Sequence, residues 1–200
     1  MIIPRTINQT NYVKKLMLMS KPVMIACGPA GCGKTLLACQ VASDYLRTNK
    51  IDKIVITRPV VSADEELGFL PGKLEKKMEP WIKPMFEIFE KERVQKSVEI
   101  VPLAYMRGRS FHNSFIIADE MQNSTMNQMK MVMTRVGEHS KMVITGDKEQ
   151  SDLSSNNGLN DILYRMHGRE FNYIDFIEMT HEDIQRSPAI IEILNLYSKA

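Results

Sequence analysis

The sequence has no apolar stretch long enough to span a bilayer, and its first residues lack the basic start and apolar core of a signal peptide. We therefore expect a cytoplasmic protein without a membrane partner. It has only three cysteines, and the spacing of Cys27, Cys32 and Cys39 is not that of a zinc site. An odd number of cysteines in a cytoplasmic chain argues for reduced thiols rather than disulfides.

The sequence also has no excess of one charge, because 26 lysines and arginines against 24 acids leave a formal net charge of +2. This balance neither requires nor excludes a nucleic-acid partner. Internal repeats, low-complexity segments and linkers are absent. The 200 residues, 44% of them hydrophobic, are enough for one domain with a proper core. We therefore expect residues 1–200 to form a single domain.

The stretch 28–35 reads Gly-Pro-Ala-Gly-Cys-Gly-Lys-Thr and fits the pattern G-x-x-x-x-G-K-[ST] of a phosphate-binding loop. Small residues let backbone N–H groups curl around a β-phosphate, Lys34 reaches the β- and γ-phosphates, and the Thr35 hydroxyl ligates Mg²⁺. A glycine-rich turn that binds nothing is the alternative, which the complete motif disfavours. The expected nucleotide contacts are Gly28, Pro29, Ala30, Gly31, Cys32, Gly33, Lys34, Thr35 and Leu36. The field of such a loop should also favour a thiolate at Cys32.

Apolar strands alternate with helices along the chain. We expect strands at 22–27, 53–57, 98–103, 114–120, 141–145 and 171–179, and helices at 6–18, 35–46, 74–92, 124–136, 157–166 and 188–197. Pro80 and Pro84 should break or kink the helix at 74–92. The alternation predicts an α/β fold with a mainly parallel sheet and helices on both faces. Ligands of such sheets bind at the carboxyl ends of the strands.

Four polar residues are expected at those carboxyl ends. Asp119 would hold Mg²⁺, usually through a water, and Glu120 would accept a proton from the water that attacks the γ-phosphate, or orient it. Asp147 would sense the γ-phosphate, and Gln150 would hydrogen-bond that phosphate or its water. The alternatives are a strand that ends in two solvated acids and an ordinary polar loop.

Other residues are candidates for contacting adenine or a nucleic acid. Gln9 offers the donor and acceptor that adenine N6 and N7 require, although a solvated helix residue is the alternative. Lys77 and Trp81 interleave charge with an aromatic ring, as in sites for single-stranded nucleic acid. Taken alone, that segment is better explained as an amphipathic helix with its aromatics in the core. Arg58 and Arg107 complete the predicted nucleic-acid path, in loops beyond the strand ends.

The chain resembles the PhoH family of ATPases in seven stretches. These are Gly-Pro-Ala-Gly-Cys-Gly-Lys-Thr (28–35), Thr-Arg-Pro (57–59), Leu-Gly-Phe-Leu-Pro-Gly (67–72), Pro-Leu-Ala-Tyr-Met-Arg-Gly-Arg (102–109), Asp-Glu-Met-Gln-Asn (119–123), Gln-Met-Lys-Met (128–131) and Thr-Gly-Asp (145–147). The stretches at 67–72 and 102–109 are the specific ones, and the resemblance extends from about Thr6 to the C-terminus. The chain departs from the family at Cys32, where threonine or serine is expected, and at Met121, where alanine is usual. Neither departure removes a catalytic group.

The resemblance implies a RecA-like phosphate-loop fold similar to the first core domain of superfamily-one helicases, with ATP and Mg²⁺ as cofactors. Members of the family are linked to RNA metabolism and phosphate starvation in bacteria and also occur in phages, which would place a phage protein in the host cytoplasm. Longer relatives carry an added nuclease or RNA-binding domain, so ribonuclease activity is not expected here. The leading function is an ATPase that remodels RNA or single-stranded DNA. A kinase and an inactive nucleotide-dependent scaffold are the alternatives, and Asp119-Glu120 favours water as the acceptor.

Superfamily-one helicases hold ATP between two core domains, whereas this chain has length for one. We therefore expect a homo-oligomer, a ring of about six subunits, in which a neighbour completes each site. Arg186 is the first candidate for the completing arginine and Arg109 is the second. Arg186-Ser187 weakly matches the Leu-x-x-x-Tyr-Arg-Ser motif of those helicases. The alternative is a monomer in which Arg186 pairs with Glu182 or Asp183 at the surface.

Overall fold

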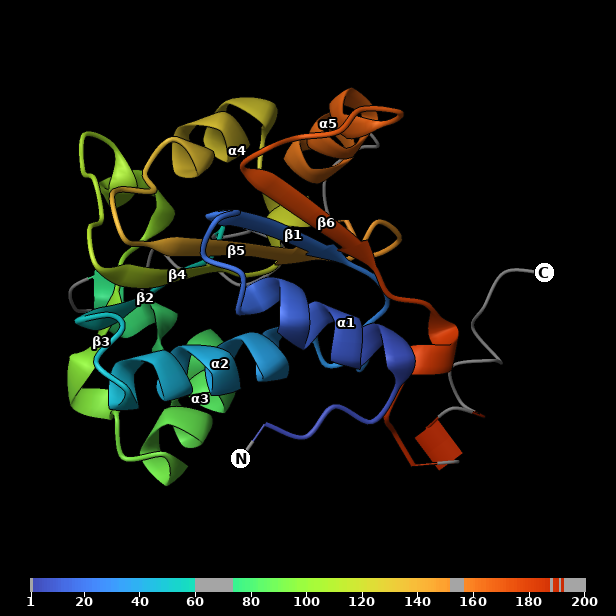
Figure 1. Ribbon diagram of the computed structural model, residues 1–200, viewed down its shortest axis with the longest axis horizontal. Coiled ribbons are helices and arrows are strands. Elements are labelled where there is room, and N and C mark those ends of the chain that lie inside the picture. The colour runs from blue at the N-terminus through green and yellow to red at the C-terminus, as the bar shows by residue number, and fades with distance from the viewer. Residues whose placement is uncertain (1, 60–73, 152–156, 188, 191, 193–200) are drawn as a thin grey trace.

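The computed structural model of the chain describes residues 2–59, 74–151, 157–187, 189–190 and 192, with the backbone alone described for residues 74–79 and 81 (Figure 1). Its centre is a sheet of six strands in the order β3-β2-β4-β5-β1-β6. The strands are β1 (Val23–Cys27), β2 (Lys53–Thr57), β3 (Val98–Ile100), β4 (Ser114–Ala118), β5 (Lys141–Gly146) and β6 (Ile174–Glu178). Every neighbouring pair is parallel, which confirms the predicted α/β architecture.

Helices cover both faces of the sheet (Figure 1). One face carries α1 (Ile7–Leu16), α2 (Lys34–Arg47) and α3 (Leu74–Lys91), and the other carries α4 (Met126–Met133) and α5 (Gly158–Met166). Two buried apolar clusters, one on each face, form the core. In the part of the chain that the structure describes, no helix combines the length and apolar character needed to cross a membrane.

Pro80 and Pro84 were expected to break or kink the third helix. The break is wrong, because α3 runs through both prolines as one helix, and the kink stays a prediction. Both prolines are exposed. The carbonyl groups that lose an N–H partner on this outer face can therefore bond to water, which lowers the cost of a proline inside a helix. The expected helix at 188–197 falls almost entirely outside the described residues, as does the stretch at 67–72.

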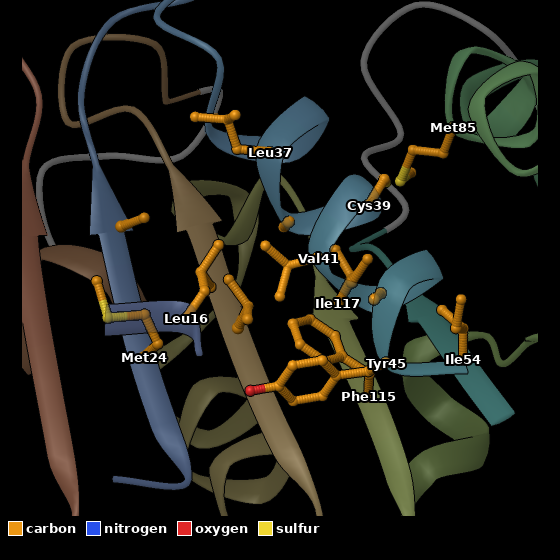
Figure 2. Packing of buried hydrophobic residues seen from close by; sticks show 14 of the residues in the cluster. Leu16, Met24, Leu37, Cys39, Val41, Tyr45, Ile54, Met85, Phe115 and Ile117 are labelled. Atoms are coloured by element: carbon orange, nitrogen blue, oxygen red, sulfur yellow. The ribbon is translucent and has the colours of Figure 1, made fainter. Parts of the chain in front are cut away.

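Packing of α2 on the sheet fixes the start of that helix beside the strand ends. Leu37, Val41 and Tyr45 repeat at four-residue spacing, so one stripe of α2 faces the sheet and all three are buried (Figure 2). The ring of Tyr45 meets that of Phe115 on β4 edge-on, with centroids 6.0 Å apart and planes at 89°. Burial of each such side chain stabilises the fold by about 1.5–3 kcal/mol. The segment that links β1 to α2 is thereby held at the carboxyl ends of the strands.

A buried lysine lies at the amino-terminal ends of the strands. Lys141, the first residue of β5, is fully buried and donates to the backbone oxygens of Lys15, Leu18 and Lys21 at 2.9, 2.9 and 2.7 Å. Burial lowers the pKa of Lys141 to about 8. The ammonium thus joins the end of α1 to the segment that enters β1, on the side of the sheet away from the candidate site.

Candidate functional site

The segment 28–35 joins β1 to α2 as a tight loop whose shape depends on glycine. Gly31 and Gly33 have φ values of 88° and 91°, in the region that favours glycine. A β-carbon built on Gly31 would lie 2.5 Å from Nε of Arg186, so a larger residue there would have to displace the Arg186 side chain. Gly33 is the N-cap of α2 and supplies no side-chain acceptor. The N-terminal amides of α2 are therefore available to an anion, as in phosphate-binding loops.

The Lys34 side chain bonds to the backbone of this loop. Its Nζ donates to the backbone oxygens of Gly28 and Pro29 at 2.6 and 2.9 Å and contacts Sγ of Cys32 at 3.6 Å. A phosphate oxygen is a stronger acceptor than a carbonyl because it is charged. The ammonium therefore lies where a phosphate in the loop would attract its protons.

Asp119 follows β4 and connects three elements. Its Oδ1 accepts hydrogen bonds from Oγ1 of Thr35 at 2.7 Å and from Oγ1 of Thr145, on β5, at 2.5 Å. The side chain is only 6% exposed. A hydroxyl and a carboxylate are hard oxygen donors of the kind that Mg²⁺ prefers, and the ion usually adds phosphate and water oxygens to such a pair. The described residues contain no group of three or more His, Cys, Asp or Glu placed to hold a metal. The predicted pair Thr35 and Asp119 thus fits Mg²⁺ bound together with a nucleotide.

Glu120 occupies a left-handed backbone conformation, with φ 54° and ψ 40°, which is uncommon for a residue other than glycine. Its half-buried carboxylate accepts a 2.5 Å hydrogen bond from Nε2 of Gln122. Oε1 of Gln122 in turn accepts the backbone N–H of Asp147 at 3.1 Å. The buried Gln122 amide therefore holds the loop after β4 and the loop after β5 at a fixed separation.

The same glutamine is connected to the start of α5. Oγ of Ser151 donates to the backbone oxygen of Gln122 at 3.0 Å, and Nδ2 of Asn157 donates to Ser151 Oγ at 3.1 Å. Asn157 also caps α5, because its Oδ1 accepts the backbone N–H of Asn160 at 2.9 Å. The loops that carry Glu120 and Asp147 are thus fastened to α5 by side chains as well as by the backbone.

The segment after β6 crosses the phosphate loop. The backbone N–H of Gln185 donates to the Gly31 oxygen at 3.1 Å, and the Arg186 side chain lies directly over Gly31. Asp183 anchors this segment to the start of α1 by accepting from Thr6 Oγ1 at 2.5 Å and Asn8 Nδ2 at 2.9 Å. Burial alone would raise the pKa of Asp183, but hydrogen bonds from Thr6, Thr180 and Asn8 outweigh it and lower that pKa. Arg186 is therefore held against the phosphate loop of its own chain.

Gln9 lies under the loop with its amide already engaged. Nε2 donates to the backbone oxygens of Cys32 and Asp183 at 3.0 and 3.3 Å, and Oε1 accepts the Arg5 N–H at 2.7 Å. To read adenine, the amide would have to exchange these partners. The role of Gln9 in reading adenine stays a prediction. In the structure its side chain joins α1 to the phosphate loop.

The prediction of a thiolate at Cys32 is wrong. The residue is fully buried, and burial raises the pKa of its thiol even though Lys34 acts in the opposite direction. Cys27 and Cys39 are buried as well, and all three cysteines are free, as expected. Cys32 therefore fills space under the loop.

The remaining predicted residues lie at varied distances from the loop. Leu36 is exposed in the first turn of α2, and Asp147 is buried beside Gln122 while Gln150 is exposed three residues later. Arg58 directly follows β2 and is half-buried. Arg107 is exposed after the short helix η3 (Leu103–Met106), and Arg109 lies at the β3 edge of the sheet. Lys77 and Trp81 fall on α3, where their side chains are outside the described part.

Strands β2, β4 and β5 separate Arg109 from β1, so Arg109 does not reach its own phosphate loop.

Sequence reasoning missed two residues that organise the site. Gln122 stands within the recognised stretch 119–123, but no role was assigned to it. Asp183 ends the pattern Thr-x-x-Asp at 180–183. This pattern is a capping box, which is typical of the start of a short helical turn. Both are polar side chains with 2% exposure. A buried polar group needs hydrogen-bond partners, so the burial of these two side chains indicates that they organise their surroundings. That burial can be seen only in the folded chain.

The fold and the loop define a protein of the phosphate-loop class with a RecA-like parallel sheet. The family model described as PhoH-like protein matches residues 1–198, and the chain therefore belongs to the PhoH-like family. A PhoH-like protein of Synechocystis sp. is 39% identical over 210 residues, covering 98% of this chain and 62% of the relative. Protein PhoH of Escherichia coli is 38% identical over 211 residues, covering 98% of this chain and 58% of the relative. The chain thus spans about three-fifths of the length of these curated relatives.

A solved structure shares the fold. The SWI2/SNF2 ATPase core of Sulfolobus solfataricus, solved in complex with double-stranded DNA, superposes with a TM-score of 0.50 at 16% sequence identity. The match covers 89% of this chain and 44% of that chain. At this identity the likeness establishes a common architecture and nothing about the ligands of the present protein.

Gln122→Met should lower the free energy of unfolding by about 1–3 kcal/mol, because the buried N–H of Asp147 loses its acceptor while the side-chain volume is nearly kept. Urea denaturation of the wild type and the variant measures this. Gln95→Met, at an exposed position of the short helix η2 (Gln95–Ser97), is the control and should stay within about 0.5 kcal/mol of the wild type. Equal stability of Gln122→Met and Gln95→Met would contradict the role given to Gln122.

Proposed function

We propose that this protein binds ATP with Mg²⁺ and hydrolyses it to ADP and phosphate. The observation that carries the proposal is the Asp119 carboxylate, which is buried and bonded to both Thr35 of the phosphate loop and Thr145 of β5. A carboxylate so placed beside a complete phosphate loop suits a nucleotide-bound Mg²⁺. Because the chain spans only part of its relatives, the activity of whole family members is not transferred to it.

Each residue has a defined task in the proposed reaction. The loop amides and Lys34 bind the β- and γ-phosphates, and Thr35 and Asp119 would hold Mg²⁺, which neutralises the charge that develops on the phosphate oxygens. A water oxygen attacks the γ-phosphorus while the bond from that phosphorus to the bridging oxygen breaks. Glu120 takes the proton of the attacking water. Gln122 keeps the Glu120 carboxylate turned toward the loop after β5, where Asp147 and Gln150 would meet the γ-phosphate.

We also propose that hydrolysis is coupled to RNA or single-stranded DNA. Arg58 and Arg107 support this, since Arg58 follows β2 and Arg107 follows β3 and η3, beyond the carboxyl ends of these strands. A kinase remains the second candidate, but Glu120 next to Asp119 suits water as the acceptor. A scaffold without activity is disfavoured because Lys34 and Glu120 are both present.

Lys34→Ala should abolish ATP turnover by removing the charge that binds the phosphates. Glu120→Gln should keep ATP bound but lower turnover by about 10²- to 10⁴-fold, because an amide cannot take the proton. Phosphate release from ATP, measured with and without RNA, single-stranded DNA and small-molecule acceptors, tests both variants and separates the candidate functions. Wild-type turnover in Glu120→Gln would remove Glu120 from the mechanism.

The placement of Arg186 favours a role in its own chain, and the expected role in the site of a neighbouring subunit stays a prediction. The side chain lies on its own loop and Asp183 holds its segment there. We propose that Arg186 binds the γ-phosphate in the same chain and stabilises the charge of the transition state. A ring of about six subunits stays a prediction, and Arg109 keeps its place as the candidate from a neighbour.

Arg186→Ala should lower turnover by about 10³-fold or more if the arginine touches the γ-phosphate. Mixing Arg186→Ala with Lys34→Ala decides which chain it serves. If Arg186 acts in its own chain, every site in the mixture lacks either Lys34 or Arg186. Phosphate release by the mixture then stays at the level of the two variants alone. Recovery of activity in the mixture would return Arg186 to a neighbouring site.

A further inference from the structure

The sheet ends at β3, whose only partner among the described strands is β2. A groove of about 380 Å³ runs along the outer side of β3. Phe86 of α3, Ile100 of β3, and Pro102, Tyr105 and Arg109 beyond β3 are among the residues that line it. A second hollow of about 520 Å³ also includes Phe86 and Ile100 and extends the groove toward Lys83. None of these residues belongs to the nucleotide site of its own chain.

Arg109 is held in the groove as a flat cation. Its Nη2 donates to Oε1 of Glu99 at 2.6 Å, and its guanidinium carbon lies 4.6 Å from the ring centre of the buried Phe111. Lys53 binds the other carboxylate oxygen of Glu99 at 3.0 Å and lies 5.5 Å from the same ring. Burial would raise the pKa of Glu99, but the hydrogen bonds from Arg109 and Lys53 lower it. The plane of Arg109 is therefore fixed before any ligand arrives.

Tyr105 supplies an aromatic surface beside this cation. Its side chain is 56% exposed at the rim of the groove, on η3, whereas Pro102 is buried and Phe86 and Ile100 are half-buried. An exposed ring in one groove with a fixed guanidinium plane and apolar side chains is a combination on which unpaired nucleic-acid bases stack. A volume of about 380 Å³ is ample for one base.

The charges around the groove favour an anionic ligand. Among the described residues that line the two hollows, the cations are Arg109 and Lys83 and the carboxylate is that of Glu99, which is already bonded to Arg109 and to Lys53. The groove also adjoins the proposed nucleic-acid path, because Val101 N–H bonds to the Ile56 oxygen at 2.9 Å, two residues before Arg58. A peptide strand added to β3 is less favoured, since a strand of three residues followed by Pro102 offers few backbone partners.

We propose that the groove binds one unpaired base of a single-stranded nucleic acid, stacked against Tyr105 and the Arg109 guanidinium. The proposal rests on the nucleic-acid part of the proposed function and adds a base site at the far edge of the sheet from the phosphate loop. Stacking is indifferent to sequence, so the site accepts RNA and single-stranded DNA alike.

Fluorescence anisotropy with labelled oligo-U, oligo-dT and an abasic strand of equal length tests the base contact. Tyr105→Ala should weaken binding of both normal strands about tenfold or more and leave the abasic strand unchanged. Tyr105→Phe, which keeps the ring, should restore the affinity. The control is Tyr164→Ala, on α5 at 84% exposure, which should leave all three affinities unchanged.

Three outcomes would overturn the proposal. Unchanged affinity of Tyr105→Ala for the normal strands would mean that no base stacks there, as would be the case for a peptide site. Equal weakening for normal and abasic strands would mean a backbone contact. Failure of the wild type to bind any strand while it hydrolyses ATP would remove the nucleic-acid role together with this site, whereas the first two outcomes remove the groove alone.

Discussion

The hydrogen bonds to the Asp119 carboxylate are the contacts on which the site depends. One oxygen of this buried group receives the hydroxyls of Thr35 and Thr145, which come from α2 and β5. A buried carboxylate is costly unless hydrogen bonds satisfy it, so the two threonines and the strand end stabilise one another. This arrangement fixes the start of α2 relative to the middle of the sheet. The phosphate loop is thereby placed before any nucleotide binds.

Two further polar side chains bring distant parts of the chain to the same place. Gln122 joins the loop of Glu120 to that of Asp147, and Asp183 joins the start of α1 to the segment that carries Arg186. Neither side chain is proposed to touch the substrate. Their common effect is preorganisation, because charged groups held in place before binding stabilise a transition state without a further cost of reorganisation. The site is therefore assembled from both ends of the chain.

Local patterns in the sequence were enough to predict the sheet, the phosphate loop and the acids after β4. These features depend on residues within a few positions of one another, and the topology of alternating strands and helices then brings their ends together. The direction of Arg186 could not be predicted, because the bonds that hold its segment reach from Asp183 to Thr6, 177 residues away. The same applies to Gln122, whose partner Asp147 lies 25 residues ahead. The reactivity expected of Cys32 failed for a related reason, since motif position does not reveal burial.

The most direct test of the account is the Mg²⁺ dependence of ATP binding, measured by calorimetry on the wild type and on Asp119→Asn. Asparagine keeps an oxygen acceptor for Thr35 and Thr145 but loses the charge that would hold the ion. The account predicts one ATP site per chain in the wild type, with affinity that rises when Mg²⁺ is added and no such rise in Asp119→Asn. The account would be contradicted by a wild type that binds no ATP, or by an equal gain from Mg²⁺ in both proteins.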